Sequence, residues 1–203
     1  MSRPHVAAVI LAAGASTRLG RPKQLLDLVG RPLLQRTLDH VNASAADSVW
    51  LVLGARADAI RAAIEPGRAQ VVDNPRWADG QSTSMRLGLD HAAPSADAVL
   101  FVLGDQPLIL STAIDAVIAA YAEGRPPIVQ PTYAGQPGNP VLFDRSLFGQ
   151  LRSVEGDQGA REVVRAHAGA VRRVAIADGS RPDDVDDEAA YSAVVAAWAA
   201  RTR

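Results

Sequence analysis

The sequence predicts an α/β fold, a three-layer, doubly wound and mainly parallel sheet with helices on both faces. Short apolar runs alternate with longer amphipathic segments along the chain. The apolar runs are continuous rather than alternating with polar residues, as in strands that are buried on both faces. The length of 203 residues suits one domain, so we expect a single domain spanning residues 1–203.

The expected strands are the apolar runs of strand length. In chain order they are residues 6–11, 49–53, 71–72, 99–103, 128–129 and 171–176, with 141–143 as an additional candidate. The run 99–103 is the strongest signal, and 71–72 is the weakest.

The expected helices are the amphipathic segments between these runs, at residues 32–41, 55–64, 82–91, 111–121, 159–167 and 187–200. Ser111 is a suitable start for the fourth helix, and Gly124 marks its end. Residues 131–140, rich in Gly and Pro, interrupt the alternation, and we expect them at a sheet edge where ligands bind.

Composition excludes several classes of protein. A formal net charge of −1 argues against binding nucleic acid through a broad basic surface. The absence of cysteine excludes disulfides, thiolate nucleophiles and cysteine-based zinc sites. No apolar run reaches about 18 residues, and the N-terminal stretch is a poor signal peptide. We therefore expect a cytoplasmic protein with no membrane and no nucleic-acid partner.

Lysine usage singles out one position. Of 21 Lys and Arg residues, Lys23 is the only lysine. A flexible, compact ammonium can follow a phosphate as it moves, whereas a guanidinium has a planar, fixed geometry. A functional requirement at Lys23 is the favoured reading, and chance is the alternative.

Small residues and two cations follow the first strand, at residues 11–23. The spacing matches neither G-x-G-x-x-G nor the Walker pattern. Backbone N–H groups of small residues can cradle anionic oxygens, and Arg18 and Lys23 could grip different phosphates of one triphosphate. A tight turn with two solvated charges is the alternative.

Acidic residues occur in two further places. Asp105 directly follows the strand 99–103, where the carboxyl end of a central parallel strand faces the ligand crevice. Magnesium is held by one or two carboxylates plus substrate phosphates, so Asp105 is a predicted ligand. The acidic run 183–188 is favoured at a helix N-terminus by the macrodipole alone.

Residues 11–23, which read L-A-A-G-x-S-x-R-x-G-x-x-K, resemble the signature loop of the MobA/MocA-like nucleotidyltransferase family. The resemblance implies a nucleotide-diphospho-sugar transferase-like, Rossmann-like fold in which this loop wraps the triphosphate of an NTP. The implied nucleotide-binding residues in the loop are Leu11, Ala12, Ala13, Gly14, Ser16, Arg18 and Lys23.

Three other segments match the same family. N-x-x-W-x-x-G followed by S-x-x-x-G-L, at residues 74–89, implies that Gly80 and Ser84 line the nucleobase pocket, with N-capping by Ser82 as the plain alternative. Gly-Asp-Gln-Pro, at 104–107, resembles the metal-binding motif of the CTP:molybdopterin cytidylyltransferase branch. The D-x-D at 184–186 implies Asp184 as the second ligand of Mg²⁺, with Asp186 as a further candidate.

Two segments resemble the family's acceptor side, at residues 138–143 and 156–161. The second opens an expected helix, where free N–H groups and an arginine suit an anion. The implied acceptor-binding residues are Gly138, Asn139, Pro140, Gly159, Ala160 and Arg161.

Together the motifs predict a Mg²⁺-dependent nucleotidyltransferase with Lys23, Arg18 and Asp105 as catalytic residues. We expect transfer of CMP from CTP to a phosphorylated acceptor, with molybdopterin as the favoured acceptor. The product of this reaction would pass to a molybdenum hydroxylase. GTP or another NTP, a sugar or polyol phosphate acceptor, and a non-catalytic nucleotide-binding cofactor chaperone remain alternatives. An oxidoreductase on a dinucleotide fold is disfavoured because G-x-G-x-x-G is missing.

Overall fold

The computed structural model describes residues 3–157, 159–177 and 182–201. Its described strands form one eight-stranded sheet in the order β3-β2-β1-β4-β7-β5-β6, with β8 paired to β5. The strands are β1 (Val6–Ala12), β2 (Ser48–Leu53), β3 (Gln70–Asp73), β4 (Ala98–Leu103), β5 (Ile128–Tyr133), β6 (Gln136–Pro137), β7 (Val141–Asp144) and β8 (Val171–Ile176).

Strand direction confirms the predicted class. β1 pairs in parallel with both β2 and β4, β3 extends this parallel set beside β2, and β8 is parallel to β5. Among the described strands, only β7 and the short β6 run against the others. The fold is therefore α/β with a mixed, mainly parallel sheet.

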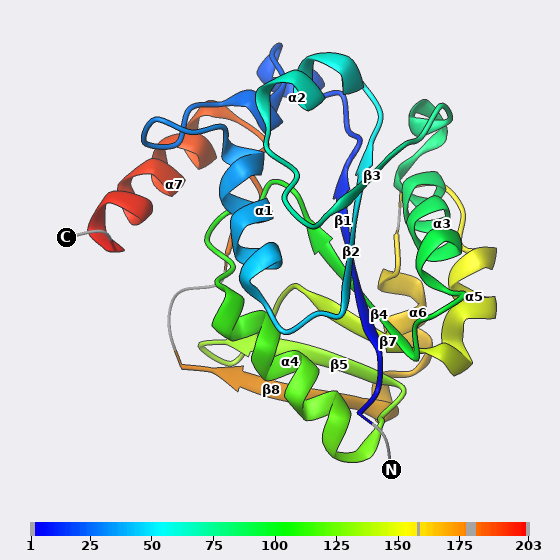
Figure 1. Cartoon of the computed structure of the whole chain (residues 1–203). Coiled ribbons are helices and arrows are strands. Elements are labelled where there is room, and N and C mark those ends of the chain that lie inside the picture. The colour runs from blue at the N-terminus through cyan, green and yellow to red at the C-terminus, as the bar shows by residue number, and fades with distance from the viewer. Residues whose placement is uncertain (1–2, 158, 178–181, 202–203) are drawn as a thin grey trace.

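Helices cover both faces of the sheet (Figure 1). The longer helices are α1 (Leu33–Ala43), α2 (Ala57–Ala63), α3 (Gln81–Ala92), α4 (Ser111–Gly124), α5 (Phe148–Ser153), α6 (Arg161–Ala166) and α7 (Glu188–Arg201). One apolar cluster joins the sheet to α1, α2 and α4, and a second joins it to α3, α5 and α6.

The pleat of β1 explains why both faces are apolar. Val6, Ala8 and Ile10 belong to the cluster under α1 and α4, whereas Ala7 and Val9 belong to the cluster under α3. Because successive side chains point to opposite faces, a strand buried on both sides must be apolar at every position. This accounts for the uninterrupted run that predicted the strand.

Several elements differ from the sequence-based expectation. α5 was not expected, whereas the additional candidate at 141–143 is confirmed as strand β7. β5 extends to Tyr133 beyond the apolar pair at 128–129, because β8 pairs along its whole length. α6 begins at Arg161, since Gly159 lies in the left-handed region at φ +55° and forms a turn.

The C-terminal helix α7 packs beside α1, away from the sheet (Figure 1). A third apolar cluster joins the two regions through Leu26, Leu28, Leu33, Leu108, Val185 and Val194. The Arg36 guanidinium lies 4.9 Å from the ring centroid of Trp198, and Arg201 donates to the carbonyl of Leu108 at 2.9 Å. These contacts hold the segment 182–201 against the loop that follows β1.

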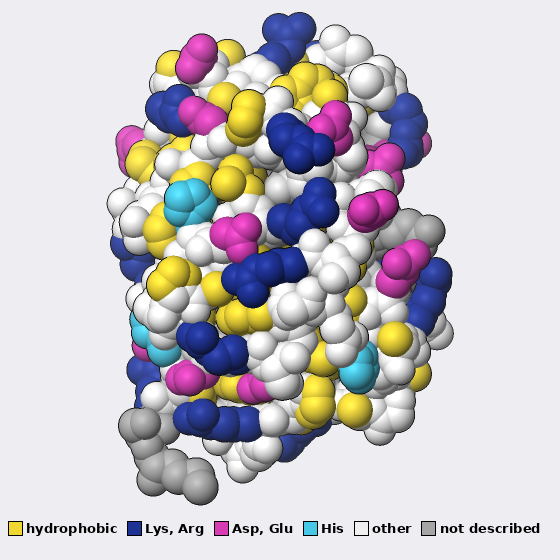
Figure 2. Space-filling model, turned by 90° about the vertical axis from the view of Figure 1, so that its right-hand side faces the viewer, with side chains coloured by type: hydrophobic (Ala, Val, Ile, Leu, Met, Phe, Trp, Pro, Cys, Tyr) yellow, Lys and Arg dark blue, Asp and Glu magenta, His cyan; other side chains and the backbone are white. Residues whose placement is uncertain are grey.

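Charges of both signs are interspersed on the face that carries α3 and α5 (Figure 2). Arg152 pairs with Asp90 at 2.8 Å, and Arg76 pairs with Asp79 at 2.9 Å. No helix of the described segments is both long and apolar enough to cross a membrane.

Substitution of Gly88 tests how closely α3 packs on the sheet. A Cβ at this position would lie 2.3 Å from Cγ1 of Val9 on β1. Gly88→Ala should therefore destabilise the protein by about 1–3 kcal/mol through overpacking. Thermal unfolding followed by circular dichroism measures the effect.

Gly149 in α5 is the matched control, because a Cβ there meets no atom within 4 Å. Gly149→Ala should be neutral or stabilising by up to about 1 kcal/mol, since alanine is the better helix former. Equal unfolding midpoints for the two variants would contradict the placement of α3.

Tyr121 predicts a stability difference that depends on pH. Its buried hydroxyl donates to a carboxylate oxygen of Asp144 at 2.6 Å. Burial alone raises the pKa of Asp144, but hydrogen bonds from Tyr121 and Ser146 outweigh it and hold that pKa below its usual range. Tyr121→Phe should cost about 1.5–3 kcal/mol at neutral pH, as expected for a hydrogen bond to a charged group.

The sign of the pH effect follows from the lowered pKa. Stabilisation of ionised Asp144 is complete above the usual aspartate range and is lost as the pH falls through the lowered value. The difference in free energy of unfolding between wild type and Tyr121→Phe should therefore become smaller in acid. Tyr133→Phe is the control, because the Tyr133 hydroxyl donates to the neutral carbonyl of Asn139 at 2.8 Å. The difference in free energy of unfolding between this variant and wild type should not change in acid.

Candidate active site

The loop that follows β1 is held in shape by its own polar groups. Ser16 adopts φ +57°, and its hydroxyl accepts a hydrogen bond from the backbone N–H of Lys23 at 3.0 Å. Gln24 is buried and donates to the carbonyls of Ala12 and Gly14 at 3.0 and 2.9 Å. These bonds tie the end of the loop to its beginning and fix where Lys23 emerges.

Gln24 is a site residue that sequence reasoning missed. It lies directly after the motif, and the residue is 3% exposed. Neither spacing nor periodicity distinguishes a buried glutamine at this position from an exposed one, so only the structure identifies it as part of the loop.

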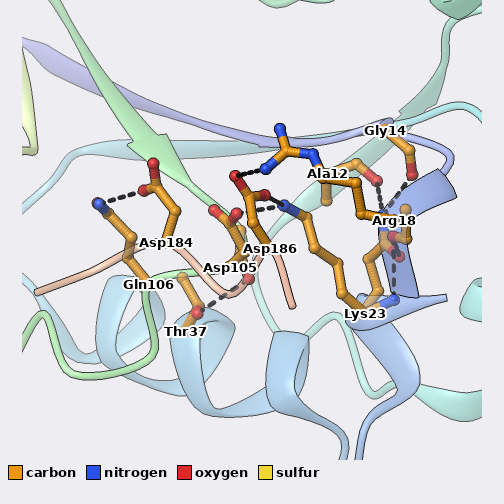
Figure 3. A network of polar contacts seen from close by, with 12 residues as sticks. Ala12, Gly14, Arg18, Lys23, Thr37, Asp105, Gln106, Asp184 and Asp186 are labelled. Atoms are coloured by element: carbon orange, nitrogen blue, oxygen red, sulfur yellow. Dashed lines mark hydrogen bonds and ion pairs between the residues drawn. The ribbon is translucent and has the colours of Figure 1, made fainter. Parts of the chain in front are cut away.

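The carboxyl end of β4 lies very close to that of β1. The N–H of Gly104 donates to the carbonyl of Leu11 at 2.9 Å, and a Cβ on Gly104 would be 2.9 Å from the Cβ of Ala12. From α1, the Thr37 hydroxyl donates to the carbonyl of Gly104 at 3.2 Å. This approach places Asp105 beside the loop that follows β1 (Figure 3).

Lys23 lies between two carboxylates (Figure 3). Its Nζ is 2.5 Å from Oδ2 of Asp105 and 3.0 Å from Oδ1 of Asp186, and its side chain is only 17% exposed. Arg18 donates to the other oxygen of Asp186 at 3.0 Å. The structure thus brings together four residues that the sequence analysis selected from three separate segments.

Asp184 has a different partner. Its Oδ1 accepts a hydrogen bond from the side-chain amide of Gln106 at 2.6 Å (Figure 3). The same amide nitrogen is 3.2 Å from the carbonyl of Pro182. Gln106 was part of the motif at 104–107, but the sequence assigned it no role. Its burial beside Asp184 is a tertiary feature that joins β4 to the C-terminal segment.

The electrostatics of the site follow from this pairing. Burial lowers the pKa of Lys23, but the charges and hydrogen bonds of Asp105 and Asp186 outweigh it and raise that pKa above its usual value. The hydrogen bond from Lys23 holds the pKa of Asp186 below its usual range. Burial, together with the nearby charge of Asp105, raises the pKa of Asp184. Lys23 is therefore cationic and Asp186 anionic at neutral pH.

The residues predicted for the nucleobase pocket lie at the start of α3. Gly80 has φ +106° and precedes the helix, whereas Ser84 is buried and accepts a hydrogen bond from Asn74 at 2.9 Å. Capping by Ser82 is wrong, because α3 begins at Gln81 and Ser82 lies inside its first turn. Trp77, 36% exposed, stands beside this region, with its Cβ against Gly54.

The two predicted acceptor segments lie at different places. Asn139, between Gly138 and Pro140, donates to the side-chain oxygen of Gln106 at 3.2 Å, beside the Asp105 turn. The segment that contains Gly159, Ala160 and Arg161 lies by α3, where Asp157 accepts a hydrogen bond from the N–H of Gln81 at 3.1 Å. The first segment therefore contacts the turn after β4, and the second contacts the start of α3.

The described residues contain no cluster of three His, Cys, Asp or Glu side chains arranged to hold a metal ion. Asp105 and Asp186 instead share the Lys23 ammonium as a cation. Two carboxylates that already surround a positive charge can serve a magnesium ion if phosphates and water supply its other ligands.

Comparison with known proteins places this geometry in a family. Residues 8–171 match the family model described as MobA-like NTP transferase domain. Nicotine blue oxidoreductase of Paenarthrobacter nicotinovorans is 35% identical over 194 residues, which cover 90% of this chain and 93% of that relative.

Two solved structures extend the comparison. Rv0371c of Mycobacterium tuberculosis H37Rv, in a complex with manganese, is 32% identical with a TM-score of 0.80 and covers 95% of this chain and 98% of its own. A CMP:2-keto-3-deoxy-manno-octonic acid synthetase, complexed with CTP, is 15% identical with a TM-score of 0.78 over 97% and 99% of the two chains, so it shares the fold.

The likeness confirms the expected nucleotide-diphospho-sugar transferase-like fold. The family match ends before the segment that supplies Asp184 and Asp186, yet it spans both the loop after β1 and the turn after β4. By this match the chain belongs to the family of MobA-like NTP transferase domains.

Proposed function

We propose that this protein transfers a nucleoside monophosphate from an NTP to a phosphorylated small molecule, with CTP as the favoured donor and molybdopterin as the favoured acceptor. The observation that carries the proposal is the convergence of Arg18, Lys23 and Asp105 at the carboxyl edge of the sheet. Cations beside a partly buried carboxylate suit a triphosphate and a divalent metal better than they suit a neutral substrate.

The chemistry is an in-line displacement at the α-phosphorus. An oxygen of the acceptor phosphate forms a bond to this phosphorus, and the bond to the bridging oxygen of the β-phosphate breaks. Pyrophosphate leaves with the electron pair. An acceptor phosphate is ionised at neutral pH, so the reaction requires positioning and charge neutralisation rather than a strong base.

Arg18 and Lys23 bind the triphosphate in this proposal. In the protein alone, both cations are paired with carboxylates at 2.5–3.0 Å. Exchange of these carboxylates for phosphate oxygens keeps each cation paired, so it avoids the penalty of leaving a half-buried charge without a partner. Stabilisation of the leaving pyrophosphate then follows from the positive charge of Lys23.

A divalent metal fits the carboxylates of the site. Asp105 and Asp184 would hold it, with Asp186 as a further candidate, and it would neutralise charge on the phosphate oxygens. The relative Rv0371c has been crystallised in a complex with manganese, which supports the binding of a divalent ion. Magnesium is the proposed ion because its usual ligands are carboxylates and phosphates.

The choice of CTP and molybdopterin rests on the motif resemblance at residues 104–107 and 156–161. Gly138, Asn139, Pro140, Gly159, Ala160 and Arg161 are the proposed acceptor-binding residues. A molybdenum hydroxylase is the proposed recipient of the product.

Electron transfer is a second candidate, because a relative at 35% identity is named an oxidoreductase. Release of pyrophosphate distinguishes the two. Purified protein with Mg²⁺ and molybdopterin should release pyrophosphate from CTP in preference to the other NTPs. Absence of release with every NTP and with molybdopterin, sugar phosphate and polyol phosphate acceptors would overturn the proposal.

Asp105→Asn tests the carboxylate after β4. The amide keeps the size of the side chain but removes the charge that holds Lys23 and the metal, so kcat should fall more than tenfold, equivalent to about 1.4 kcal/mol. Steady-state pyrophosphate release measures this. Asp73→Asn is the matched control, because Asp73 ends β3, which β2 and β1 separate from β4, and pairs with Arg61 at 2.6 Å. A tenth or more of wild-type kcat in folded Asp105→Asn would refute the assignment.

Lys23→Arg tests whether an ammonium is required. The larger planar guanidinium cannot take the same place between Asp105 and Asp186, so kcat/KM for the NTP should fall at least tenfold, about 1.4 kcal/mol. Arg21→Lys is the control in the same loop, since Arg21 is 54% exposed and pairs with Glu188 at 2.8 Å. Its kinetics should stay within twofold of wild type, whereas unchanged kinetics for Lys23→Arg would show that any cation suffices.

A further inference from the structure

Gln106 uses its whole side-chain amide inside the protein. It is 4% exposed. Its nitrogen donates to Asp184 at 2.6 Å and to the carbonyl of Pro182 at 3.2 Å, while its oxygen accepts from Asn139 at 3.2 Å. Both donors and the acceptor are satisfied, which is the arrangement expected of a buried polar group.

The three partners come from two parts of the chain that are far apart in the sequence. Pro182 and Asp184 belong to the segment before α7, and Asn139 belongs to the loop between β6 and β7. Gln106 itself follows Asp105 at the end of β4. One amide therefore ties a proposed metal carboxylate to a proposed acceptor residue.

Only an amide can make these contacts. A glutamate would bring a second carboxylate to Asp184 and could not donate to Pro182. A methionine of similar length would leave Asp184 and Asn139 without this partner. The bond to Gln106 occupies Oδ1 of Asp184, and Oδ2 accepts no hydrogen bond within the described residues.

We propose that Gln106 is a positioning residue that links the divalent-cation site to the acceptor loop. Its hydrogen bond orients Asp184 so that Oδ2 is available to the cation. A movement of Asn139 would shift the Gln106 amide and so reorient the Asp184 carboxylate. The inference rests on the proposed function, because that function identifies one site as metal-binding and the other as acceptor-binding. The link between them can be tested by cation binding alone.

The experiment measures Mn²⁺ binding to the whole protein by electron paramagnetic resonance, without substrate. Gln106→Met should weaken Mn²⁺ binding at least tenfold, because loss of a group that orients a metal ligand typically costs 10–100-fold in affinity. Gln35→Met is the matched control. Gln35 is also buried, at 4% exposed, and its amide donates to Asp39 at 2.7 Å and to the carbonyl of Glu65 at 3.2 Å, so the same substitution there should leave Mn²⁺ affinity within twofold of wild type.

Two further variants test the route. Asn139→Ala should weaken Mn²⁺ binding about threefold in the wild-type background and not at all in Gln106→Met, because the effect passes through the amide. Likewise, the double variant Gln106→Met with Asp184→Asn should bind Mn²⁺ as weakly as Asp184→Asn alone. If Gln106→Met does not fold, the effect of Asn139→Ala alone decides the linkage.

Three results would overturn the inference. These are Mn²⁺ affinity within twofold of wild type in folded Gln106→Met, independent effects of the Asn139 and Gln106 variants, and a wild-type protein that binds no Mn²⁺. Failure of the proposed function is seen separately, as absence of pyrophosphate release from a wild-type protein whose Mn²⁺ binding depends on Gln106.

Discussion

The close pairing of β1 with β4 is the constraint on which the site depends. The N–H of Gly104 donates to the carbonyl of Leu11, and no Cβ fits at Gly104 against Ala12. Because parallel neighbours end at the same edge of the sheet, their following loops meet. Lys23 after β1 and Asp105 after β4 therefore reach each other at 2.5 Å, although they lie 82 residues apart in the chain.

The C-terminal segment completes this edge. Asp184 and Asp186 come from residues beyond the last strand, and the apolar cluster of α7 with α1 holds the segment against the loop after β1. Asp186 pairs with both Lys23 and Arg18, and Asp105 pairs with Lys23, so the two cations face two carboxylates. In the proposed function, phosphate oxygens would pair with the two cations and a divalent metal with the carboxylates, which would favour joint binding of the two over the binding of either alone.

Recognisable motifs predicted much of the site but not the residues that hold it in place. Residues 11–23 and 104–107 have spacings that a reader of the sequence can identify. Gln24 and Gln106 orient the loop and Asp184, yet a glutamine carries no periodic signal, and its role depends on which carbonyls and carboxylates surround it. Likewise, Ser84 is in the predicted motif, but only the structure shows that its hydroxyl accepts a hydrogen bond from Asn74.

The sequence by itself determined the α/β class and the order of its main elements, because strands buried on both faces must be apolar throughout and the helices between them amphipathic. It also selected Arg18, Lys23, Asp105 and Asp186 as chemistry-bearing residues. Tertiary structure alone decided that Lys23 lies between two carboxylates, that Asp184 faces Gln106, and that one predicted acceptor segment contacts Gln106 while the other contacts the start of α3. The physical reason is that these contacts join residues far apart in the chain, and local propensity carries no information about which distant groups will share one charge or one hydrogen bond.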